Sequence, residues 1–292
     1  MHGSYYRRAR AFSRANLQDI RDKFTPTEVV VFIDDIHDVA GTIRARDPQD
    51  ALRLREIATW RSIEGMIADF IAEPLGIPSY VIAVKHPTRM ACSLLFGRGL
   101  RVYSAFPITR TRGSEEARRE IEAFKARLRD EGIIVFDPST IDELLLRTAL
   151  EAVPPETTEV EVDLSGRWNV ASEPLLTDGR PSPWEGGRSV FTRTEIEEAT
   201  KDITTQVESR DFRLIQDSDC IVAYRPNWGG TLSRGVTAEL HLARGIARRI
   251  FIYSPVDDET AGSPFQEFGN VYSTQDDLIQ ALKGLPQFQG SS

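Results

Sequence analysis

The sequence predicts an α/β protein built on a parallel sheet. Short apolar runs bounded by turn residues alternate with segments whose apolar residues recur at helical spacing, which is typical of repeated strand-helix-strand units. Such units place helices on the faces of a mostly parallel sheet, as in Rossmann-like folds. The 292 residues, of which 40% are hydrophobic and 27% charged, suffice for one large or two small globular domains.

The expected strands are short and bounded by turn residues: 28–33, 79–84, 100–105, 133–136, 220–224 and 249–253. Helical spacing predicts helices at 49–72, 114–130, 193–209, 233–247 and 274–282. Residues 154–187 are rich in Pro, Gly, Ser, Thr and acidic residues, and we expect an excursion or lid rather than core there. Because the GRG at 97–99 precedes a new strand, we divide the chain into a smaller α/β region, 1–98, and a second domain, 99–292, with an insertion at 139–192.

The charge and hydropathy pattern narrows the classes of partner. The formal net charge of -8 and the pI of about 5.2 predict repulsion from nucleic acid and from anionic membranes, so a small molecule is the expected partner. No apolar run approaches the roughly 18 residues of a membrane span, and the N-terminus lacks the apolar segment of a signal peptide. The two cysteines have no metal-site spacing, so we expect buried thiols and a cytoplasmic location.

A glycine-rich loop after strand 220–224 is the expected ligand site. In open α/β sheets, ligands bind at the carboxyl ends of strands beside such loops. Gly229, Gly230 and Gly235 let the backbone approach a ligand, and Ser233 begins a helix whose N-terminal amides suit a phosphate. Glu239 follows on the same helix, where its carboxylate could attack C1′ of a bound sugar and hold it as a covalent ester.

Three segments carry a resemblance to a known family: VYSAFPITRTRGSEEARREIEAF, RDFRLIQDSDCIVAY and SRGVTAELHLARGIARRIFIYSP. They resemble the nucleoside 2-deoxyribosyltransferase-like superfamily, and most closely its 2′-deoxynucleoside 5′-monophosphate N-glycosidases. The resemblance implies Glu239 as the catalytic nucleophile, Asp211 as the catalytic aspartate that assists the departing base, and Tyr103 as the tyrosine of the first strand. It also implies phosphate binding by Ser233 and Gly235, a homo-oligomer (dimer or higher), and chemistry that needs no cofactor or metal.

Ser233 favours a nucleotide over a free nucleoside. The position of Ser233, six residues before Glu239, is similar to one that holds an aspartate in the transferases that act on unphosphorylated nucleosides. That aspartate binds sugar hydroxyls, and its carboxylate would repel a 5′-phosphate. Arg110 and Arg112, after the strand of Tyr103, are the expected cationic partners of the phosphate. The loop there reads SAFPITR where the monophosphate hydrolases show a glycine-serine turn.

Other interpretations of these residues stay open. Glu239 could be an ordinary exposed helix residue, Asp211 an N-cap for a helix after Ser209, and Tyr103 a core aromatic. At the level of function, the alternatives to an N-glycosidase on nucleoside monophosphates are a deoxyribosyltransferase on free nucleosides and a nucleotide-sensing module without catalysis.

The N-terminal third carries a second acidic pattern. VVVFIDDIHDV is an apolar strand followed by Asp34, Asp35 and Asp38, with His37 among them, and it resembles the Walker B strand of P-loop kinases and ATPases. No GxxxxGK[ST] occurs in the chain, so we interpret this region as a degenerate P-loop-like unit that serves as scaffold or interface. A surface acidic turn after an edge strand and a Mg²⁺-dependent kinase remnant are the alternatives.

Overall fold

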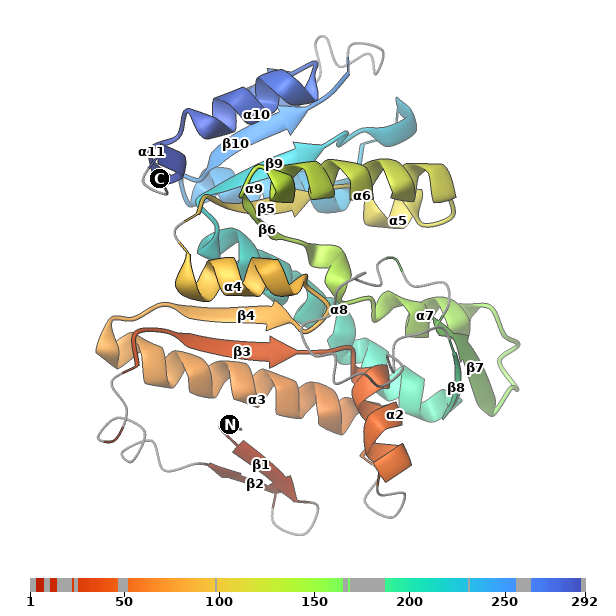
Figure 1. Ribbon diagram of the computed structural model, residues 1–292. Helices are drawn as coiled ribbons and strands as arrows, with labels where there is room; N and C mark the ends of the chain where they lie inside the picture. Colours follow the sequence, from red (N-terminus) through yellow and green to blue (C-terminus); the bar gives the residue numbers. More distant parts are fainter. Residues whose placement is uncertain are drawn as a thin grey trace. The chain divides into compact units, whose positions relative to one another are not determined.

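The computed structural model describes residues 4–7, 11–14, 23, 26–46, 52–97, 99–164, 168, 187–230, 232–255 and 264–289. The chain forms two compact units, coloured along the sequence in Figure 1. Unit 1 comprises Met1–Lys85, Ile141–Val170 and Leu176–Ser209, and unit 2 comprises His86–Thr140, Ala171–Leu175 and Arg210–Ser292. This interleaved division differs from the expected boundary between residues 98 and 99, because segments after residue 140 pack with the N-terminal region.

Unit 2 is built on a five-stranded parallel sheet, which confirms the predicted fold class. Its strands lie in the order β11-β10-β9-β5-β6. All four pairings are parallel. The bounds are Arg101–Ala105 (β5), Ile134–Phe136 (β6), Cys220–Tyr224 (β9), Arg249–Tyr253 (β10) and Asn270–Tyr272 (β11). The first strand in sequence, β5, therefore lies between the second, β6, and the third, β9, so the strand order reverses between β5 and β9.

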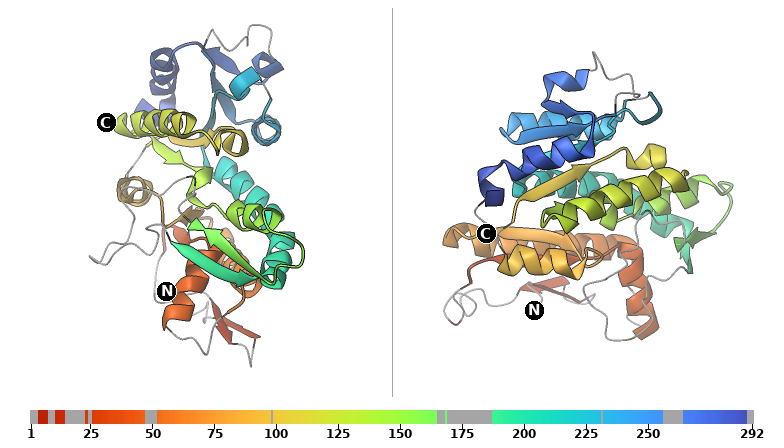
Figure 2. Two further views of the ribbon diagram at one scale, coloured as in Figure 1. Left: turned by 90° about the vertical axis from the view of Figure 1, so that its right-hand side faces the viewer. Right: turned by 45° about the horizontal axis from the view of Figure 1, so that its top comes forward.

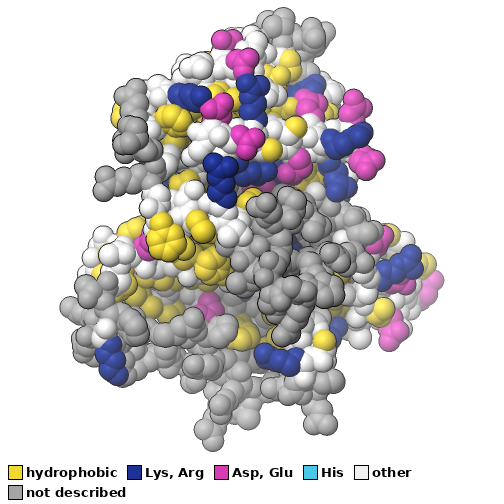
Figure 3. Space-filling view, in the orientation of Figure 1, with side chains coloured by type: hydrophobic (Ala, Val, Ile, Leu, Met, Phe, Trp, Pro, Cys, Tyr) yellow, Lys and Arg dark blue, Asp and Glu magenta, His cyan; other side chains and the backbone are white. Residues whose placement is uncertain are grey.

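Helices cover both faces of this sheet. Figure 2 shows α6 (Glu115–Asp130) and α10 (Gln275–Lys283) on one face and α9 (Arg234–Gly245) on the other. Acidic and basic side chains lie side by side over the outer surface of α6 and α10 (Figure 3), as expected for a solvated helix face. The other helical segments in the described part of unit 2 are α4 (Thr88–Phe96), α5 (Ile108–Thr111), η3 (Pro138–Thr140), the end of α8 (Arg193–Asp217), η5 (Trp228–Gly230), η7 (Pro264–Glu267) and α11 (Pro286–Gln289).

Unit 1 combines two small sheets with long helices. The strands β3 (Val29–Ile33) and β4 (Ser79–Ala83) are parallel, and β7 (Glu159–Asp163) and β8 (Arg188–Thr192) are antiparallel. A third pair, β1 (Ser4–Arg7) with β2 (Ala11–Arg14), is also antiparallel. The helical segments are α2 (Ile36–Arg46), α3 (Leu54–Ala72), η2 (Glu73–Leu75), α7 (Leu144–Glu151) and the first part of α8 (Arg193–Asp217).

Part of the predicted excursion belongs to the core of unit 1. Val160 and Val162 alternate with exposed acidic residues along β7 and are buried. They share one apolar cluster with Leu145 and Leu146 of α7 and with residues of α2 and α3. The expectation that residues 154–187 are too polar for core is therefore wrong at β7, where the period-2 alternation buries one face. Residues 165–167 and 169–186 lie outside the described residues.

Other differences concern single elements. Helix α8 continues to Asp217, beyond the predicted end at 209, and β11 was not predicted. Cys220 is buried, as expected, but Cys92 is exposed. None of the helices in the described ranges combines the length and hydropathy of a membrane-spanning segment.

Candidate active site in unit 2

The strand order of unit 2 places its expected ligand site between β5 and β9. In an open parallel sheet, ligands bind beside the carboxyl ends of the strands at the point where the order reverses. Here β5 and β9 are parallel neighbours, with Tyr103 paired to Ile221 and Ala105 to Ala223. The segments that follow these two strands therefore emerge at the same edge of the sheet.

Tyr103 and Glu239 meet in a hydrogen bond. The buried Tyr103 lies on β5, and its hydroxyl donates to Oε1 of Glu239 over 2.9 Å. Glu239 is on α9, in the second turn after the N-cap residue Ser233. Its other oxygen, Oε2, is buried and has no hydrogen-bond partner among the described residues. The alternative of an exposed helix glutamate is therefore wrong, and one carboxylate oxygen is oriented while the other is left for a further contact.

Asp211 is held by its neighbour in helix α8. Oδ1 of Asp211 accepts from Nε and Nη2 of Arg210 over 3.1 and 2.8 Å. Nη2 also donates to the Pro138 carbonyl over 2.9 Å. Asp211 lies inside α8 rather than at its start, so the N-cap interpretation is wrong. The contact with Pro138 gives Arg210 a second anchor and limits the movement of the Asp211 carboxylate.

The pKa values of Glu239 and Tyr103 are shifted by burial and by the charged groups of Asp211 and Arg210 beside them. Burial raises the pKa of Glu239 to about 8, and the nearby Asp211 carboxylate adds to the rise, whereas the Tyr103 hydrogen bond and Arg210 oppose it. Burial also raises the pKa of Tyr103 well above its ordinary value, with further increases from Asp211 and Glu239. At neutral pH, Glu239 therefore holds a proton most of the time, next to a second carboxylate that is paired with a guanidinium. A pair of carboxyl groups in different environments is typical of acid–base sites.

The loop between β9 and α9 has a fixed, unusual backbone. Gly229 and Gly230 have φ angles of 65° and 73°, which favour glycine, and Arg225 has a φ of 43°. The guanidinium carbon of Arg225 lies 4.2 Å from the centre of the Trp228 ring, and Nη1 contacts Glu120 Oε1 over 3.0 Å. These contacts hold the loop in a strained conformation, a feature that clusters at functional sites.

Ser233 begins α9 as expected. Its hydroxyl accepts from the Val236 amide over 3.4 Å, and the residue is buried. Gly235 lies in the first turn, and a Cβ added to it would meet nothing within 4 Å, so packing does not require glycine there. A close approach of a ligand to the backbone would explain the glycine.

Arg110 and Arg112 lie in the segment that follows β5. Arg110 belongs to α5 and is exposed, while Arg112 follows this helix and is half-buried. Both are thus at the carboxyl edge of the sheet, the edge from which the loop after β9 also emerges. Their contact with a phosphate stays a prediction.

One residue of this site was missed in the sequence. Arg210 directly precedes Asp211, and this adjacency was the available signal, but nothing in the sequence shows that both side chains turn the same way. Ser104 follows Tyr103 on β5, and its buried hydroxyl oxygen has no hydrogen-bond partner among the residues that the structure describes. Alternation along a strand directs its side chain to the face opposite Tyr103.

The acidic strand end of unit 1 is a second buried polar cluster. Asp35 and Asp38 are buried, so the interpretation as a surface turn is wrong. Both contact the ammonium of the buried Lys85, which also lies 3.0 Å from Asp34 Oδ1. Burial raises the pKa of Asp34 to about 6, against the lowering effect of Lys85. Burial alone would lower the pKa of Lys85, but the three carboxylates outweigh it and raise that pKa.

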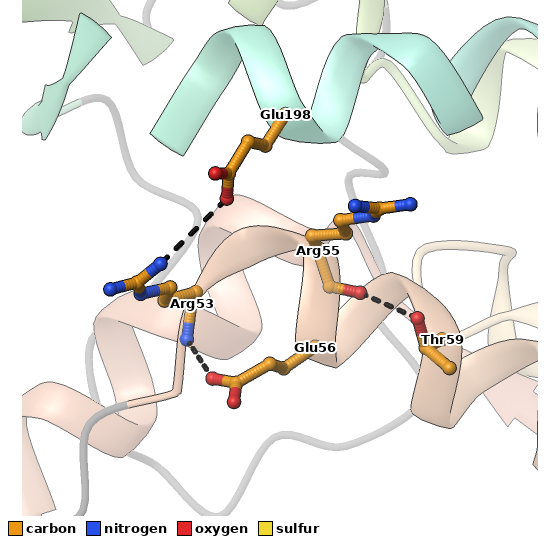
Figure 4. Close-up of a pocket in the computed structure, with 5 residues that line it drawn as sticks. All are labelled: Arg53, Arg55, Glu56, Thr59 and Glu198. Carbon is orange, nitrogen blue, oxygen red and sulfur yellow. Dashed lines mark hydrogen bonds and ion pairs between the residues drawn. The ribbon is translucent and has the colours of Figure 1, made fainter. Parts of the chain in front are cut away.

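A surface hollow in unit 1 has the lining of a solvated groove. It has a volume of about 330 Å³ and lies between α3 and α8, lined by Arg53, Arg55, Glu56, Thr59 and Glu198 (Figure 4). Arg53 and Glu198 face each other at 3.8 Å, and their side chains are 66% and 35% exposed. Exposed pairs of this kind contribute little to stability or binding, so this hollow offers no buried reactive group.

Comparisons with protein-family models, curated proteins and solved structures give no match. The functional inference therefore rests on the residues and geometry of this chain.

Proposed function

We propose that unit 2 is an N-glycosidase that releases the base of a nucleoside 5′-monophosphate through a covalent glycosyl-Glu239 intermediate. One observation carries the proposal. Oε1 of Glu239 is fixed by the Tyr103 hydroxyl, while Oε2 is buried without a hydrogen-bond partner in the described part of the chain. A carboxylate with one oriented oxygen and one unpaired, desolvated oxygen is suited to attack a carbon centre.

The phosphate would be anchored at the start of the helix that carries Glu239. The amides at the N-terminus of α9, next to Ser233, accept an anion through their N–H groups and the helix dipole. Glu239 follows Ser233 by six positions, which corresponds to a rise of about 9 Å along the helix axis. Helical side chains lean toward the N-terminus, so the Glu239 carboxylate can lie closer to the start of α9 than this rise. Arg110 and Arg112 would add cationic contacts.

The reaction would proceed in two displacements. Oε2 of the ionised Glu239 attacks C1′, and the electron pair of the C1′–N bond leaves with the base. Asp211, whose carboxylate is paired with Arg210, orients the departing base, and the base takes up a proton from the solvent. Water then attacks C1′, the C1′–Oε2 bond breaks, the Glu239 carboxylate is regenerated, and the proton of the water passes to Asp211.

The free protein and the reaction require different protonation states of Glu239. Because the pKa of Glu239 is raised to about 8, the carboxyl group must lose its proton before it attacks. The positive charge that develops on the sugar in the transition state stabilises the ionised form in the complex. Tyr103 acts as a positioning residue, since its hydrogen bond lowers the pKa of Glu239 and orients the carboxylate.

The test is base release from a panel of ribo- and deoxyribonucleoside 5′-monophosphates, followed by chromatography. The proposal predicts a free base from at least one member with the wild-type protein and none above background with Glu239→Ala. Release that survives the substitution would remove Glu239 from the mechanism. Binding of a monophosphate without release would favour a nucleotide-sensing module.

Parallel incubations distinguish the transferase alternative. Free nucleosides replace the monophosphates, and a second base is supplied as acceptor. The phosphate site predicts that a nucleoside monophosphate is cleaved with a higher kcat/KM than the corresponding nucleoside. Base exchange on free nucleosides with a higher kcat/KM would identify a deoxyribosyltransferase instead.

A further inference from the structure

The start of helix α2 in unit 1 gathers an imidazole and two carboxylates. The sequence DIHD places Asp35 just before α2 and His37 and Asp38 in its first turn. One potential ligand atom from each of these three side chains lies within 4.8 Å of the others. All three residues are buried, and all come from a single four-residue segment. The helix itself thus arranges the group locally.

His37 is the unusual member of this group. It is fully buried, and neither Nδ1 nor Nε2 has a hydrogen-bond partner among the described residues. Nε2 lies 3.9 Å from Oδ1 of Asp38, which is beyond hydrogen-bond range. Because buried polar groups are normally paired, an imidazole directed at a carboxylate but too far away to bond with it indicates a missing partner between them.

The charges around His37 favour a cationic partner. Three carboxylates, those of Asp34, Asp35 and Asp38, contact the single ammonium group of Lys85. These three carboxylates converge on one ammonium group next to His37. The neighbouring Glu143 is paired separately, because Arg61 binds it through two hydrogen bonds of 2.5 and 2.9 Å. Backbone amides satisfy other oxygens, since Asp35 Oδ1 accepts from the Asp142 amide over 2.7 Å.

We propose that Asp35, His37 and Asp38 bind a divalent first-row transition ion, of the class of Zn²⁺ or Co²⁺. A mixed set of imidazole nitrogen and carboxylate oxygen suits these ions, whereas Mg²⁺ and Ca²⁺ prefer oxygen ligands only. Metal–ligand bonds of about 2.0–2.2 Å in a tetrahedral site separate ligand atoms by roughly 3.3 Å. The 3.9 Å between His37 and Asp38 reaches this value with a small movement of the side chains.

Lys85 and the ion would share both ligand carboxylates, those of Asp35 and Asp38. Oδ2 of Asp38 contacts Lys85 over 2.6 Å, whereas Oδ1 of Asp38 is the oxygen nearest to His37. The ion would therefore use Oδ1 and leave the Lys85 contact in place. Since all ligands come from the junction of β3 with α2, the ion would link the end of the strand to the first turn of the helix and stabilise unit 1.

Co²⁺ titration of the full chain tests the site. Visible absorption reports the coordination of Co²⁺, and calorimetry with Zn²⁺ gives the stoichiometry and affinity. We expect one ion per chain, and binding weakened by at least about tenfold in His37→Gln. The matched control is His241→Gln, because His241 is exposed on α9 in unit 2 and should leave binding unchanged. Absence of binding by the wild-type protein, or equal affinity in His37→Gln, would overturn the proposal.

A measurement on the wild-type protein covers the case in which His37→Gln fails to fold. X-ray absorption of the Zn²⁺-loaded chain should show imidazole scattering together with oxygen neighbours. A shell made of oxygen alone would overturn the assignment of His37. Far-UV circular dichroism of each metal-free variant establishes whether the titrations compare folded proteins.

Discussion

Two of the buried polar clusters in the described residues lie near the carboxyl ends of parallel strands but differ in how their carboxylates are paired. In unit 1, Asp35 and Asp38 are both in contact with the ammonium of Lys85. In unit 2, Glu239 accepts one hydrogen bond from Tyr103, and its second oxygen is buried without a partner in the described residues. Similar positions in a sheet thus give a charge-paired cluster in one unit and an underpaired carboxyl group in the other.

The paired carboxylates of unit 1 stabilise the fold, whereas the underpaired Glu239 of unit 2 is available for chemistry. A carboxylate paired with a buried cation is costly to disturb, because loss of one partner leaves an uncompensated charge. A buried carboxyl group with a raised pKa destabilises the fold when it ionises. Glu239 titrates near 4.5 when unfolded and near 8 when folded, so its contribution to stability is full below pH 4.5 and is lost as the pH rises through 8. An underpaired group that weakens the fold is expected where function requires it.

Glu239→Gln should produce the largest change. The amide has the shape of the carboxyl group but cannot form the glycosyl ester, so we expect kcat/KM for base release to fall by about 10⁴-fold or more. Because the amide does not ionise, thermal unfolding at pH 8 should show a variant at least as stable as the wild type. Glu116→Gln, at an exposed position of α6, is the control and should retain activity. Equal losses in both variants would contradict a specific role for Glu239.

Lys85→Met should destabilise unit 1 strongly. The substitution leaves buried carboxylates without their ammonium partner, and we expect the free energy of unfolding to fall by about 3–5 kcal/mol. Lys283→Met removes a partly exposed pair with Glu131, in which Nζ and Oε2 are 2.5 Å apart, and should cost less than about 1 kcal/mol. Denaturant unfolding of both variants measures the contrast. Similar losses would show that the Lys85 cluster is not exceptional.

The pH dependence of base release should report the ionisation of Glu239. Below a pKa of about 8, the ionised fraction falls about tenfold per pH unit, so kcat/KM should rise by about 50-fold between pH 6 and 8 and level off above pH 9 at about 100-fold its value at pH 6. A decrease in kcat/KM across pH 8 would instead make Glu239 a general acid. Initial rates at low substrate concentration distinguish the two.

Tyr103→Phe should have a smaller effect with a distinctive signature. The hydroxyl that lowers the pKa of Glu239 is removed, so the rising limb of the pH profile should move to higher pH. At pH 7 we expect kcat/KM to fall by about tenfold. The pH profile of the variant is the readout that a purely structural defect would not shift. An unchanged midpoint would remove the hydrogen bond from the mechanism.

Arg110→Ala should have the smallest effect. The side chain is exposed, so we expect a several-fold rise in KM for a nucleoside monophosphate and little change for the free nucleoside. Arg119→Ala, at an exposed position of α6, is the control. A similar rise for the nucleoside would argue against contact of Arg110 with the phosphate.

Much of the sheet could be predicted from the sequence, because buried parallel strands form short apolar runs. Cys220–Tyr224 and Arg249–Tyr253 were expected with the bounds that the structure shows. The strand β7 was missed because its apolar residues alternate with acidic ones inside a polar stretch. The end of α8 was placed too early, at 209, although the residues around Asp211 include no Gly or Pro that would end a helix.

The candidate site was predictable only in part. A glycine-rich loop before a helix is visible in the sequence, and it placed Ser233 at the start of α9. The hydrogen bond between Tyr103 and Glu239 joins residues that are 136 positions apart, and it depends on the strand order. Similarly, the ammonium of Lys85 lies among carboxylates about 50 residues earlier, so the sequence could suggest the acidic strand end but not its pairing.

The most direct test of the central claim is to trap the glycosyl ester. The wild-type protein is incubated with a 2′-fluorinated nucleoside 5′-monophosphate, whose fluorine slows the hydrolysis of the ester, and is analysed by intact mass spectrometry and peptide mapping. We predict an added mass of one fluorinated sugar phosphate on the peptide that contains Glu239, and none in Glu239→Gln. Base release without an adduct on that peptide, or an adduct on another residue, would contradict Glu239 as the nucleophile.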